Sequence, residues 1–435
     1  MKDNTRTTLS KRLTESSPLE GMRLVTVPTN LADAIIIHGS LPGGDIWSPK
    51  DNPCISMLTV EMLDEGTATY SKNEIREKLE SLGASIEFNS DSHRMGFSIR
   101  CLKKDASAVI NLLALELREP VFPAKDFSVV KARLESQLDE ELEDTKYRAE
   151  TKFLQKLYPK NHPNYRYDGA ALKKFISKAT RQHLVAFHKA TYGQADAIIT
   201  AAGDIDLPML SDTFKKAFAF AKAKKINLEQ NPIKAFETKR DTDVISVPDK
   251  ASADIYIGAP IGITKSHPDY YPLLLGFSIL GGTFFARLMN NVREKKGLTY
   301  RTRAGLGGTD NNLDGYWYAF AMFAPEQFIK GEEAVMFEIE NIVKNGVTVE
   351  ELHTHKETVD GSFKVALASA QGMASVLLDN AEQGRPHEFI DAYVPMINKI
   401  TLEEVNAAIQ KYIRLDNIVT VAAGSIDKDK NPLGR

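Results

Sequence analysis

Cysteine is scarce in this 435-residue chain, which contains only Cys54 and Cys101. Two thiols can form neither a disulfide framework nor a zinc site of four thiolates, so both are expected as reduced residues in or near the core. An uninterrupted run of 18 apolar residues is also missing, and no membrane span is expected. The first residues, from Met1 to Thr5, are polar and lack the apolar stretch of a secretory signal. This favours a cytoplasmic location, whereas a signal peptide that had already been removed would allow a periplasmic one.

A basic excess is missing too. Lys and Arg number 55 against 58 Asp and Glu, which gives a net charge of −3. Proteins that bind nucleic acid usually carry a strong positive surplus, so we expect no such partner. The hydrophobic share of 43% and the charged share of 26% exclude a disordered or fibrous chain. A globular chain of this length divides into about two to four domains, with two the most common expectation.

The chain repeats itself over a long period. Residues 201–206, Ala-Ala-Gly-Asp-Ile-Asp, return as residues 422–427, Ala-Ala-Gly-Ser-Ile-Asp. Near the start of each copy, residues 24–28, Leu-Val-Thr-Val-Pro, resemble residues 244–248, Val-Ile-Ser-Val-Pro. Because such features follow in the same order in both halves, the sequence indicates a duplication rather than a solenoid of short repeats.

Other matching features concern predicted helices and strands. In each half an apolar helix ends at a Gly-Thr pair, a charged helix ends near a glycine, and two strands and a long amphipathic helix follow. A helix that begins with a Thr suited to N-capping precedes each copy of the Ala-Ala-Gly motif. The Gly-Thr pairs are Gly66-Thr67 and Gly282-Thr283, and the glycines that end the charged helices are Gly83 and Gly297. The helices that begin with a capping Thr are expected over 180–192 and 401–412.

These patterns predict an α+β fold of two homologous domains, each a mixed, mostly antiparallel sheet with helices packed on one side. We expect a flexible N-terminus over residues 1–17 and a first domain over 18–220. A polar linker follows over 221–243, because this segment has few large apolar residues. The second domain is expected over 244–435.

This organisation resembles the M16 metallopeptidase family, which includes insulinase-like and pitrilysin-like enzymes and the mitochondrial processing peptidase. The most specific likeness is residues 280–288, Leu-Gly-Gly-Thr-Phe-Phe-Ala-Arg-Leu, followed by residues 293–300, Arg-Glu-Lys-Lys-Gly-Leu-Thr-Tyr. The resemblance covers nearly the whole chain. Its length is similar to that of the short bacterial members, two-domain chains that pair into a clamshell of four domains.

In active members of that family an inverted motif, His-x-x-Glu-His, binds zinc and activates its water, and a Glu some 75 residues later is the third ligand. The resemblance places the two His positions on Met57 and Glu61 and the catalytic Glu on Val60. The third ligand position falls on Gln137, or on Leu138 if the gap differs by one. None of these residues matches the motif, and neither that motif nor His-Glu-x-x-His occurs elsewhere. The resemblance therefore implies a chain that binds no metal.

Arg293 and Tyr300 match an Arg/Tyr pair that reaches from the second half toward the zinc site in active members. The resemblance implies that the Arg binds a substrate carbonyl and that the Tyr hydroxyl donates to the oxyanion. The alternative is a purely structural role, in which Arg293 pairs with a surface carboxylate and Tyr300 caps a sheet. Glu87 stands where active members usually carry an Asn, on the family's edge strand.

Three functions remain open at this point. The first is a non-catalytic, substrate-binding subunit of a heterodimeric zinc peptidase, whose partner carries His-x-x-Glu-His and the zinc and whose substrate is a peptide; in isolation the chain could form a homodimer. The second is a structural or binding protein of the same fold without a role in proteolysis. The third is a metallopeptidase with displaced ligands, such as Glu61 with Asp64, Glu65 or His93.

Overall fold

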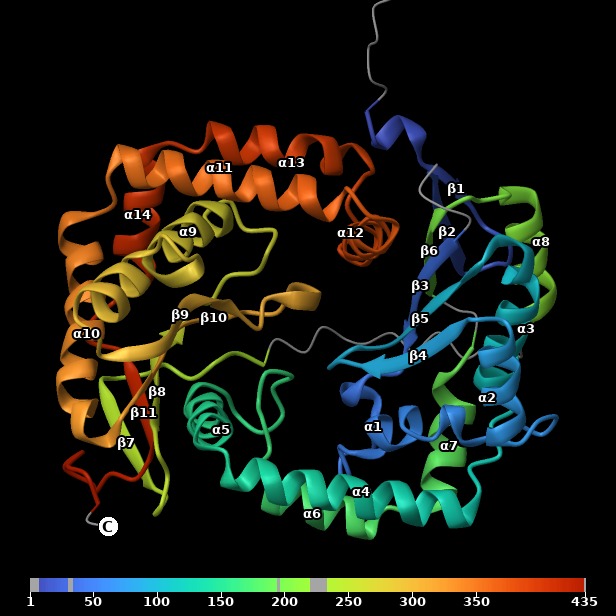
Figure 1. Ribbon diagram of the computed structural model, residues 1–435, viewed down its shortest axis with the longest axis horizontal. Helices are drawn as coiled ribbons and strands as arrows, with labels where there is room; N and C mark the ends of the chain where they lie inside the picture. Colours follow the sequence, from blue (N-terminus) through green and yellow to red (C-terminus); the bar gives the residue numbers. More distant parts are fainter. Residues whose placement is uncertain (1–7, 30–33, 194–195, 220–232, 434–435) are drawn as a thin grey trace, which may run out of the picture. The chain divides into compact units, whose positions relative to one another are not determined.

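The computed structural model describes residues 8–29, 34–193, 196–219 and 233–433. These residues fall into two compact units, each built on its own sheet (Figure 1). The first unit comprises Met1–Glu135, Lys173–Glu229 and Gly361–Val394. The second comprises Ser136–Leu172, Gln230–Asp360 and Pro395–Arg435.

The first unit contains a six-stranded sheet of order β1-β2-β6-β3-β5-β4. Its neighbours run antiparallel except β2 and β6, which are parallel. The central strand β3 is buried on both faces from Ile35 to Leu41, which suits its run of three isoleucines. Edge strand β4 is half-buried to exposed. The strands are β1 (Thr14–Ser16), β2 (Met22–Pro28), β3 (Ala34–Pro42), β4 (Ser85–Ser90), β5 (Arg94–Leu102) and β6 (Ala197–Gly203).

Helices lie against both faces of this sheet (Figure 1). Helix α3 and its neighbour α8 lie on one face, and α12 packs on β6 and β3 from the other. The prediction left this second face uncovered, but it carries Val25, Val27 and Ile36, whose apolar side chains pack with Met373 and Leu377 of α12. The helices are α1 (Ile55–Val60), α2 (Lys72–Ser81), α3 (Ala106–Arg118), α7 (Arg181–Thr191), α8 (Leu207–Ala217) and α12 (Ala370–Glu382), with 3₁₀ turns η1 (Ser10–Arg12), η2 (Asp45–Trp47), η3 (Leu63–Glu65) and η4 (Lys103–Asp105).

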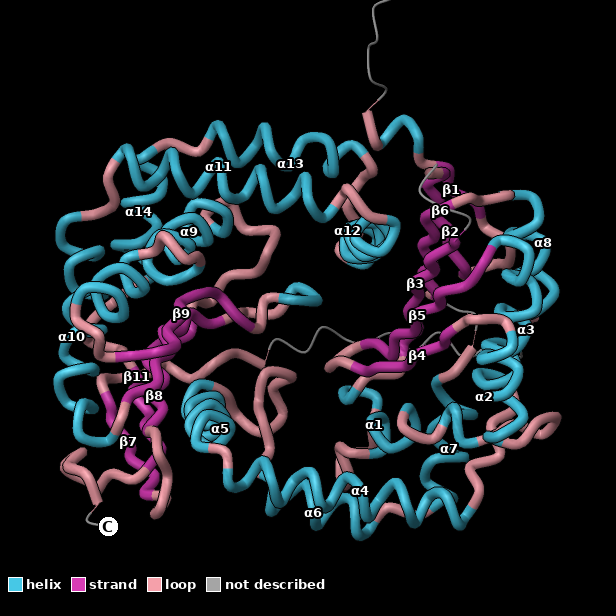
Figure 2. The backbone as a smooth tube through the Cα atoms, in the orientation of Figure 1, coloured by secondary structure: helices cyan, strands magenta, loops and turns pink. Residues whose placement is uncertain are grey.

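The second unit contains a five-stranded sheet of order β7-β11-β8-β10-β9, again with one parallel pair, β7 and β11. Figure 2 draws the strands of both sheets in magenta. Side chains alternate between its faces. On one face Phe320 and Tyr256 pack with Phe153 of α5, and on the other Trp317 stacks on Phe277 of α9. The strands are β7 (Asp241–Ser246), β8 (Ala253–Pro260), β9 (Thr299–Gly307), β10 (Tyr316–Phe323) and β11 (Val419–Gly424). The predicted α+β class with two mixed, mostly antiparallel sheets is thus confirmed.

The second unit also contains two π-helical segments, η5 and η6, which both contact β9. Four further helices begin in one unit and end in the other. The elements of the second unit are α5 (Thr145–Leu157), α9 (Tyr270–Phe277), α10 (Phe328–Asn345), α14 (Leu402–Tyr412), η5 (Ser278–Gly282), η6 (Leu288–Lys295), η7 (Asp310–Asn312) and η8 (Pro325–Gln327). The four helices shared by the units are α4 (Ala124–Glu143), α6 (Gly169–Lys178), α11 (Val349–Ala366) and α13 (Glu388–Lys399).

The two units are not the two halves of the sequence. Residues 136–172 of the first half belong to the second unit, and residues 361–394 of the second half belong to the first. The segments exchanged in this way carry α5 and α12. The boundaries expected at 220 and 244 stay a prediction, and residues 221–232 of the expected linker lie outside the described residues.

The helix starts that the repeat predicts are confirmed. Thr180 caps α7 and Thr401 caps α14, and each hydroxyl accepts a hydrogen bond from the backbone N–H three residues later. The apolar helix expected to reach Gly66 is shorter: α1 ends at Val60 and the 3₁₀ turn η3 follows. Within the N-terminal segment expected to be flexible, residues 14–16 form β1 and pair with β2. Among the described residues, none of the helices is both long enough and apolar enough to cross a membrane.

Candidate functional site

The residues at the zinc-motif positions lie at the end of α1. Met57 is half-buried, Val60 is buried, and Glu61 caps the helix C-terminus. The carboxylate of Glu61 accepts a hydrogen bond from Arg133 Nη2 of α4 at 2.5 Å. The one side chain at these positions that could bind a metal through oxygen is therefore engaged in an ion pair.

The third-ligand position does not supply a metal ligand either. Gln137 is exposed on α4, and the alternative, Leu138, is buried. A thioether and an amide are poor zinc ligands, and valine has no donor atom and cannot act as a base. Within the described ranges no group of three or more His, Cys, Asp or Glu residues is placed to hold a metal ion. The residues at the motif positions do not fit zinc.

The displaced-ligand alternative finds no support in the neighbouring carboxylates. Glu65 is buried and forms an ion pair with Lys72, as Glu61 does with Arg133. Burial raises the pKa of Asp64, and the neighbouring Glu65 charge adds to the effect. The ring Nδ1 of His93 contacts the hydroxyl of Ser92 at 2.8 Å. Glu61, Glu65 and His93 thus each have a protein partner in place of a metal.

Tyr300 lies on β9, an edge strand of the second sheet, and forms a β-bulge there. Thr299 pairs with Phe323 and Arg301 with Met322, so no residue of β10 lies opposite Tyr300. The hydroxyl of Thr299 donates to the carbonyl of Met322 at 2.5 Å and accepts from the N–H of Arg301 at 3.2 Å. Bulges redirect side chains. Tyr300 is 86% exposed, and the interpretation in which it caps the sheet does not describe this position.

Arg293 lies on η6, which packs against β9. Its Nε is 3.6 Å from Glu294 Oε1, and both side chains are more than a third exposed. An exposed pair of this kind contributes about 1 kcal/mol or less. The guanidinium therefore remains available for another oxygen, and the segments that carry Arg293 and Tyr300 lie against each other.

The Gly-Gly sequence before η6 has a packing role. Gly281 and Gly282 end the π-helical segment η5. A Cβ atom on Gly281 would lie 2.4 Å from the backbone nitrogen of Ala304, so only glycine allows η5 to pack this closely on β9. This contact helps to fix the position of the segment that carries Arg293.

Sequence reasoning missed two exposed aromatic residues beside this region. Phe284 and Phe285 are 60% and 65% exposed, and their rings form an edge-to-face pair with centroids 6.0 Å apart. They lie between Thr283, which follows the Gly-Gly pair, and the start of η6. Apolar residues in a loop look like core residues in a sequence, so only the structure reveals that these two are exposed.

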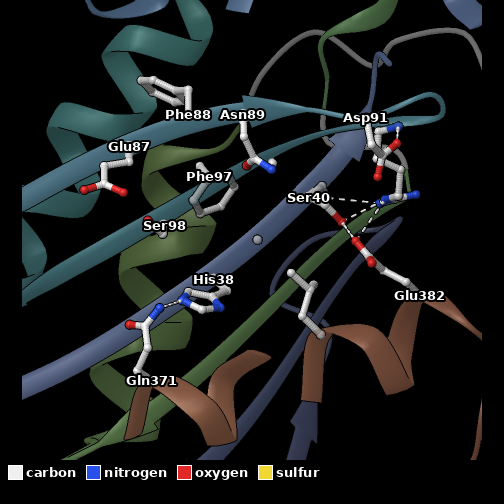
Figure 3. Close-up of a pocket in the computed structure, with 14 residues that line it drawn as sticks. His38, Ser40, Glu87, Phe88, Asn89, Asp91, Phe97, Ser98, Gln371 and Glu382 are labelled. Carbon is white, nitrogen blue, oxygen red and sulfur yellow. Dashed lines mark hydrogen bonds and ion pairs between the residues drawn. The ribbon is translucent and has the colours of Figure 1, made fainter. Parts of the chain in front are cut away.

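In the first unit, Glu87 lies on edge strand β4 and lines a polar cavity (Figure 3). The cavity is bounded by β3, β5, β4 and α12. The sequence singled out Glu87 because active relatives usually carry an Asn there, but it gave no sign of a cavity. The structure thus has two separate polar features, the Arg293–Tyr300 surface of the second unit and this cavity of the first.

The fold and these positions define a class: an α+β protein with two related mixed sheets, in which the helix that could bind zinc carries no ligand set. Two family models match the chain. The model described as "Insulinase (Peptidase family M16)" matches residues 40–163, and the one described as "Peptidase M16 inactive domain" matches residues 178–359. The chain belongs to the M16 peptidase family.

Relatives of known name cover almost the whole chain. The non-peptidase homolog YmxG of Helicobacter pylori is 22% identical over 399 residues, which is 91% of this chain and 90% of that protein. The uncharacterized zinc protease YmxG of Bacillus subtilis is 23% identical over 411 residues, 93% and 97% of the two chains. A solved structure of a peptidase M16 inactive domain from Pseudomonas fluorescens has a TM-score of 0.84 at 24% identity and covers 95% of this chain and 98% of that one. This last likeness supports the fold.

Proposed function

We propose that this chain is the non-catalytic, substrate-binding subunit of a heterodimeric M16-type zinc peptidase. The partner subunit carries His-x-x-Glu-His, the zinc ion and the base that activates water. This chain supplies Arg293 and Tyr300 to the partner's active site, where a peptide bond is hydrolysed. Alone, the chain binds no zinc and hydrolyses no peptide.

The roles of the two residues follow from their chemistry. A guanidinium donates charge-assisted hydrogen bonds, so Arg293 would hold a substrate carbonyl oxygen. A phenol donates one hydrogen bond, so Tyr300 would stabilise the oxyanion that forms when water attacks. Neither role requires the residue to take up a proton. An arrangement of this kind needs a second chain for the zinc-bound water, because Val60 cannot act as the base.

The observation that carries the proposal is the exposure of Tyr300 on its bulge beside the segment of Arg293. A large aromatic side chain turned out of an edge strand gains nothing from the core of its own sheet. The residues at Met57, Val60 and Gln137 add to the case, because a zinc site cannot be built from them. The relative from Helicobacter pylori is named a non-peptidase homolog, which agrees with this assignment.

The proposal is tested in the pair reconstituted with an M16 chain that carries His-x-x-Glu-His and copurifies with this one. Arg293→Ala and Tyr300→Phe should each lower the kcat for a quenched fluorescent peptide by about 10²-fold or more, as loss of an oxyanion-side donor does. Zinc content and pair formation should not change.

A matched control is Arg414→Ala, which removes an exposed arginine of the same unit that bonds to Asp416. This variant should keep full turnover. Unchanged turnover for both Arg293→Ala and Tyr300→Phe would overturn the proposal. The fold would then serve a structural or binding role without a part in proteolysis.

A further inference from the structure

Two of the four helices shared by the units, α11 and α13, each contain a residue that weakens a helix (Figure 1). Helix α11 carries Gly361 followed by Ser362, and helix α13 carries Pro395 in its interior. Glycine lowers helix propensity more than any residue except proline, and proline has no N–H for the carbonyl four residues earlier. Both stand where the chain passes from one unit to the other, because the units divide α11 after Asp360 and α13 after Val394.

The two weak points lie at the same level of an antiparallel helix pair. On the first-unit side, the ring of Phe363 in α11 packs on the ring of Tyr393 in α13, with centroids 4.9 Å apart. On the second-unit side, Lys356 Nζ of α11 donates to the carbonyl of Asn398 in α13 at 3.0 Å. As the residue number rises along α11, that of the neighbour in α13 therefore falls. These contacts place the glycine of α11 opposite the proline of α13.

Packing does not explain the glycine in α11. A Cβ atom on Gly361 would meet no heavy atom within 4 Å beyond its own helix, and Gly361 and Ser362 are both exposed. Glycines inside other helices differ, since a Cβ atom would lie 2.0 Å from a backbone oxygen at Gly372 of α12 and 2.3 Å from the Phe323 ring at Gly331 of α10. What Gly361 contributes is a point where the helix bends easily, because Gly/Ser pairs and prolines are where helices kink.

The helix segments on either side of this level are anchored, each within its own unit. In the first unit, Ile390 of α13 is buried in the core around α12, and Phe363 of α11 packs against the same core. In the second unit, Leu352 and His355 of α11 are buried, and so is Ile397 of α13. Bending is therefore concentrated in the short exposed stretch between the anchored segments.

The other two connecting helices, α4 and α6, differ at the corresponding places. The units divide α4 after Glu135 and α6 after Leu172. Residues 134–137 and 171–174 contain neither glycine nor proline. Of the described helices that cross between the units, one pair thus carries weak points at its crossing and the other pair does not.

From this geometry we infer that the α11–α13 pair is a hinge within the chain, at which both helices bend together and one unit turns relative to the other. A hinge consists of a few residues that absorb changes of φ and ψ while the packed segments on either side stay rigid. Gly361 has the widest conformational freedom for this, and its exposure lets water bond to backbone groups that a bend releases. The inference does not depend on Arg293, on Tyr300 or on a partner subunit.

The test uses the purified full chain with one spin label on each unit, attached at Glu77→Cys of α2 and Glu340→Cys of α10. Both positions are exposed, whereas the native Cys54 and Cys101 are buried and stay unlabelled. Double electron–electron resonance then measures the distribution of distances between the two labels. The hinge predicts more than one distance population in the otherwise unchanged chain.

Gly361→Ala should shift the ratio of these populations about fivefold toward the form in which α11 is continuous, because alanine favours the helix over glycine by about this factor. The variant folds, since the added methyl group enters open space. Pro395→Ala should shift the ratio in the same direction, because it restores a donor for the carbonyl of Asp391. The matched control is Ser136→Ala, which raises helix propensity at the crossing of α4 and should leave the distribution unchanged.

A single narrow distance distribution that Gly361→Ala does not alter would overturn the inference. Several populations that persist unchanged in both Gly361→Ala and Pro395→Ala would overturn it too, because the movement would then arise elsewhere. An equal shift caused by Ser136→Ala would show that bending is not localised in α11 and α13. The measurement needs no zinc, peptide or partner, so it and the Arg293→Ala turnover experiment fail separately.

Discussion

Of the buried glutamates in this fold, Glu116 shows how a single residue can set a pH response. Glu116 of α3 is 1% exposed, and its Oε2 has no hydrogen-bond partner among the described residues. Burial raises its pKa to about 8, with a further contribution from Asp64. Glu338 of α10, the helix that follows the second β-hairpin, is also buried, but its Oε1 accepts from Asn291 at 2.9 Å. The surroundings of Glu116 thus keep its carboxyl protonated at neutral pH.

The stability consequence has a definite sign. In the unfolded chain the Glu116 carboxyl ionises near its ordinary pKa of 4.5, whereas in the folded chain it stays protonated up to about 8. Unfolding thus becomes more favourable as pH rises from about 4.5 to about 8. The free energy of unfolding falls by at most roughly 1.4 kcal/mol for each pH unit between these two pKa values. Below pH 4.5 the group makes no difference.

Glu116→Gln should remove this penalty, because an amide carries no charge at any pH. At pH 8 we expect the variant to melt about 4 °C or more above the wild type, while at pH 5 the two should nearly coincide. Scanning calorimetry at several pH values measures this directly. The exposed Glu77→Gln serves as the control and should not alter the profile; parallel curves for Glu116→Gln and wild type would contradict the account.

The residue scale is also where the sequence was most informative about the site. That Met57, Val60 and Gln137 cannot bind zinc or activate water follows from their side-chain chemistry and needs no coordinates. The partner of Glu61 could not be predicted, because Arg133 lies on another helix more than seventy positions away. Long-range side-chain pairs depend on how elements pack, which a local pattern does not encode.

At the scale of elements, the bulge in β9 is the feature that gives Tyr300 its exposure. Thr299→Val removes the hydroxyl that bonds to Met322 and Arg301 but keeps the side-chain shape. We expect the bulge to loosen, with a loss of stability of about 1–2 kcal/mol. In the reconstituted pair, peptide hydrolysis should fall, because Tyr300 is no longer held in one orientation.

The same strand offers a control for this variant. Thr302 is buried, and its hydroxyl donates to the carbonyl of Phe320 at 2.9 Å without touching the bulge. Thr302→Val should cost a similar amount of stability and leave hydrolysis unchanged when assayed well below the melting temperature. Equal activity of both variants would show that the bulge has no part in placing Tyr300.

Several elements could be predicted from the sequence because their signals are local. The caps at Thr180 and Thr401 and the glycines that end two helices belong to this group; Gly83 and Gly297 have φ values of +57° and +63°. The bulge at Tyr300 and the π-helical segments could not be predicted in this way. The bulge is a shift in the pairing of β9 with β10, and η5 packs on β9 through Gly281. The alternation of apolar residues encodes neither contact.

At the scale of the whole molecule, the duplication and the compact units divide the chain differently. The sequence shows two halves in the same order, yet α5 packs in the second unit and α12 in the first. Amphipathic patterns predict that both helices have an apolar face. They do not say which sheet that face covers, since either sheet offers apolar strands.

The cores that these exchanged helices complete differ in kind. Around α5 the second unit buries aromatic side chains, among them Phe153, Tyr256 and Phe320. Around α12 the first unit buries aliphatic ones, such as Val25, Val27 and Leu377. The polar cavity beside α12 lies in the unit with the smaller side chains. Divergence of the two halves has thus given the two sheets cores of different composition.

The central claim is that this chain contributes binding groups and its partner contributes the metal. The most direct test is the zinc content per chain, measured by mass spectrometry on protein purified without a metal-affinity tag. The chain is measured alone and after assembly with the partner. The account predicts well below one zinc for the chain alone and about one for each assembled pair, the count for a single catalytic site. A value near one for the chain alone, removed by a chelator and restored by titration, would contradict it.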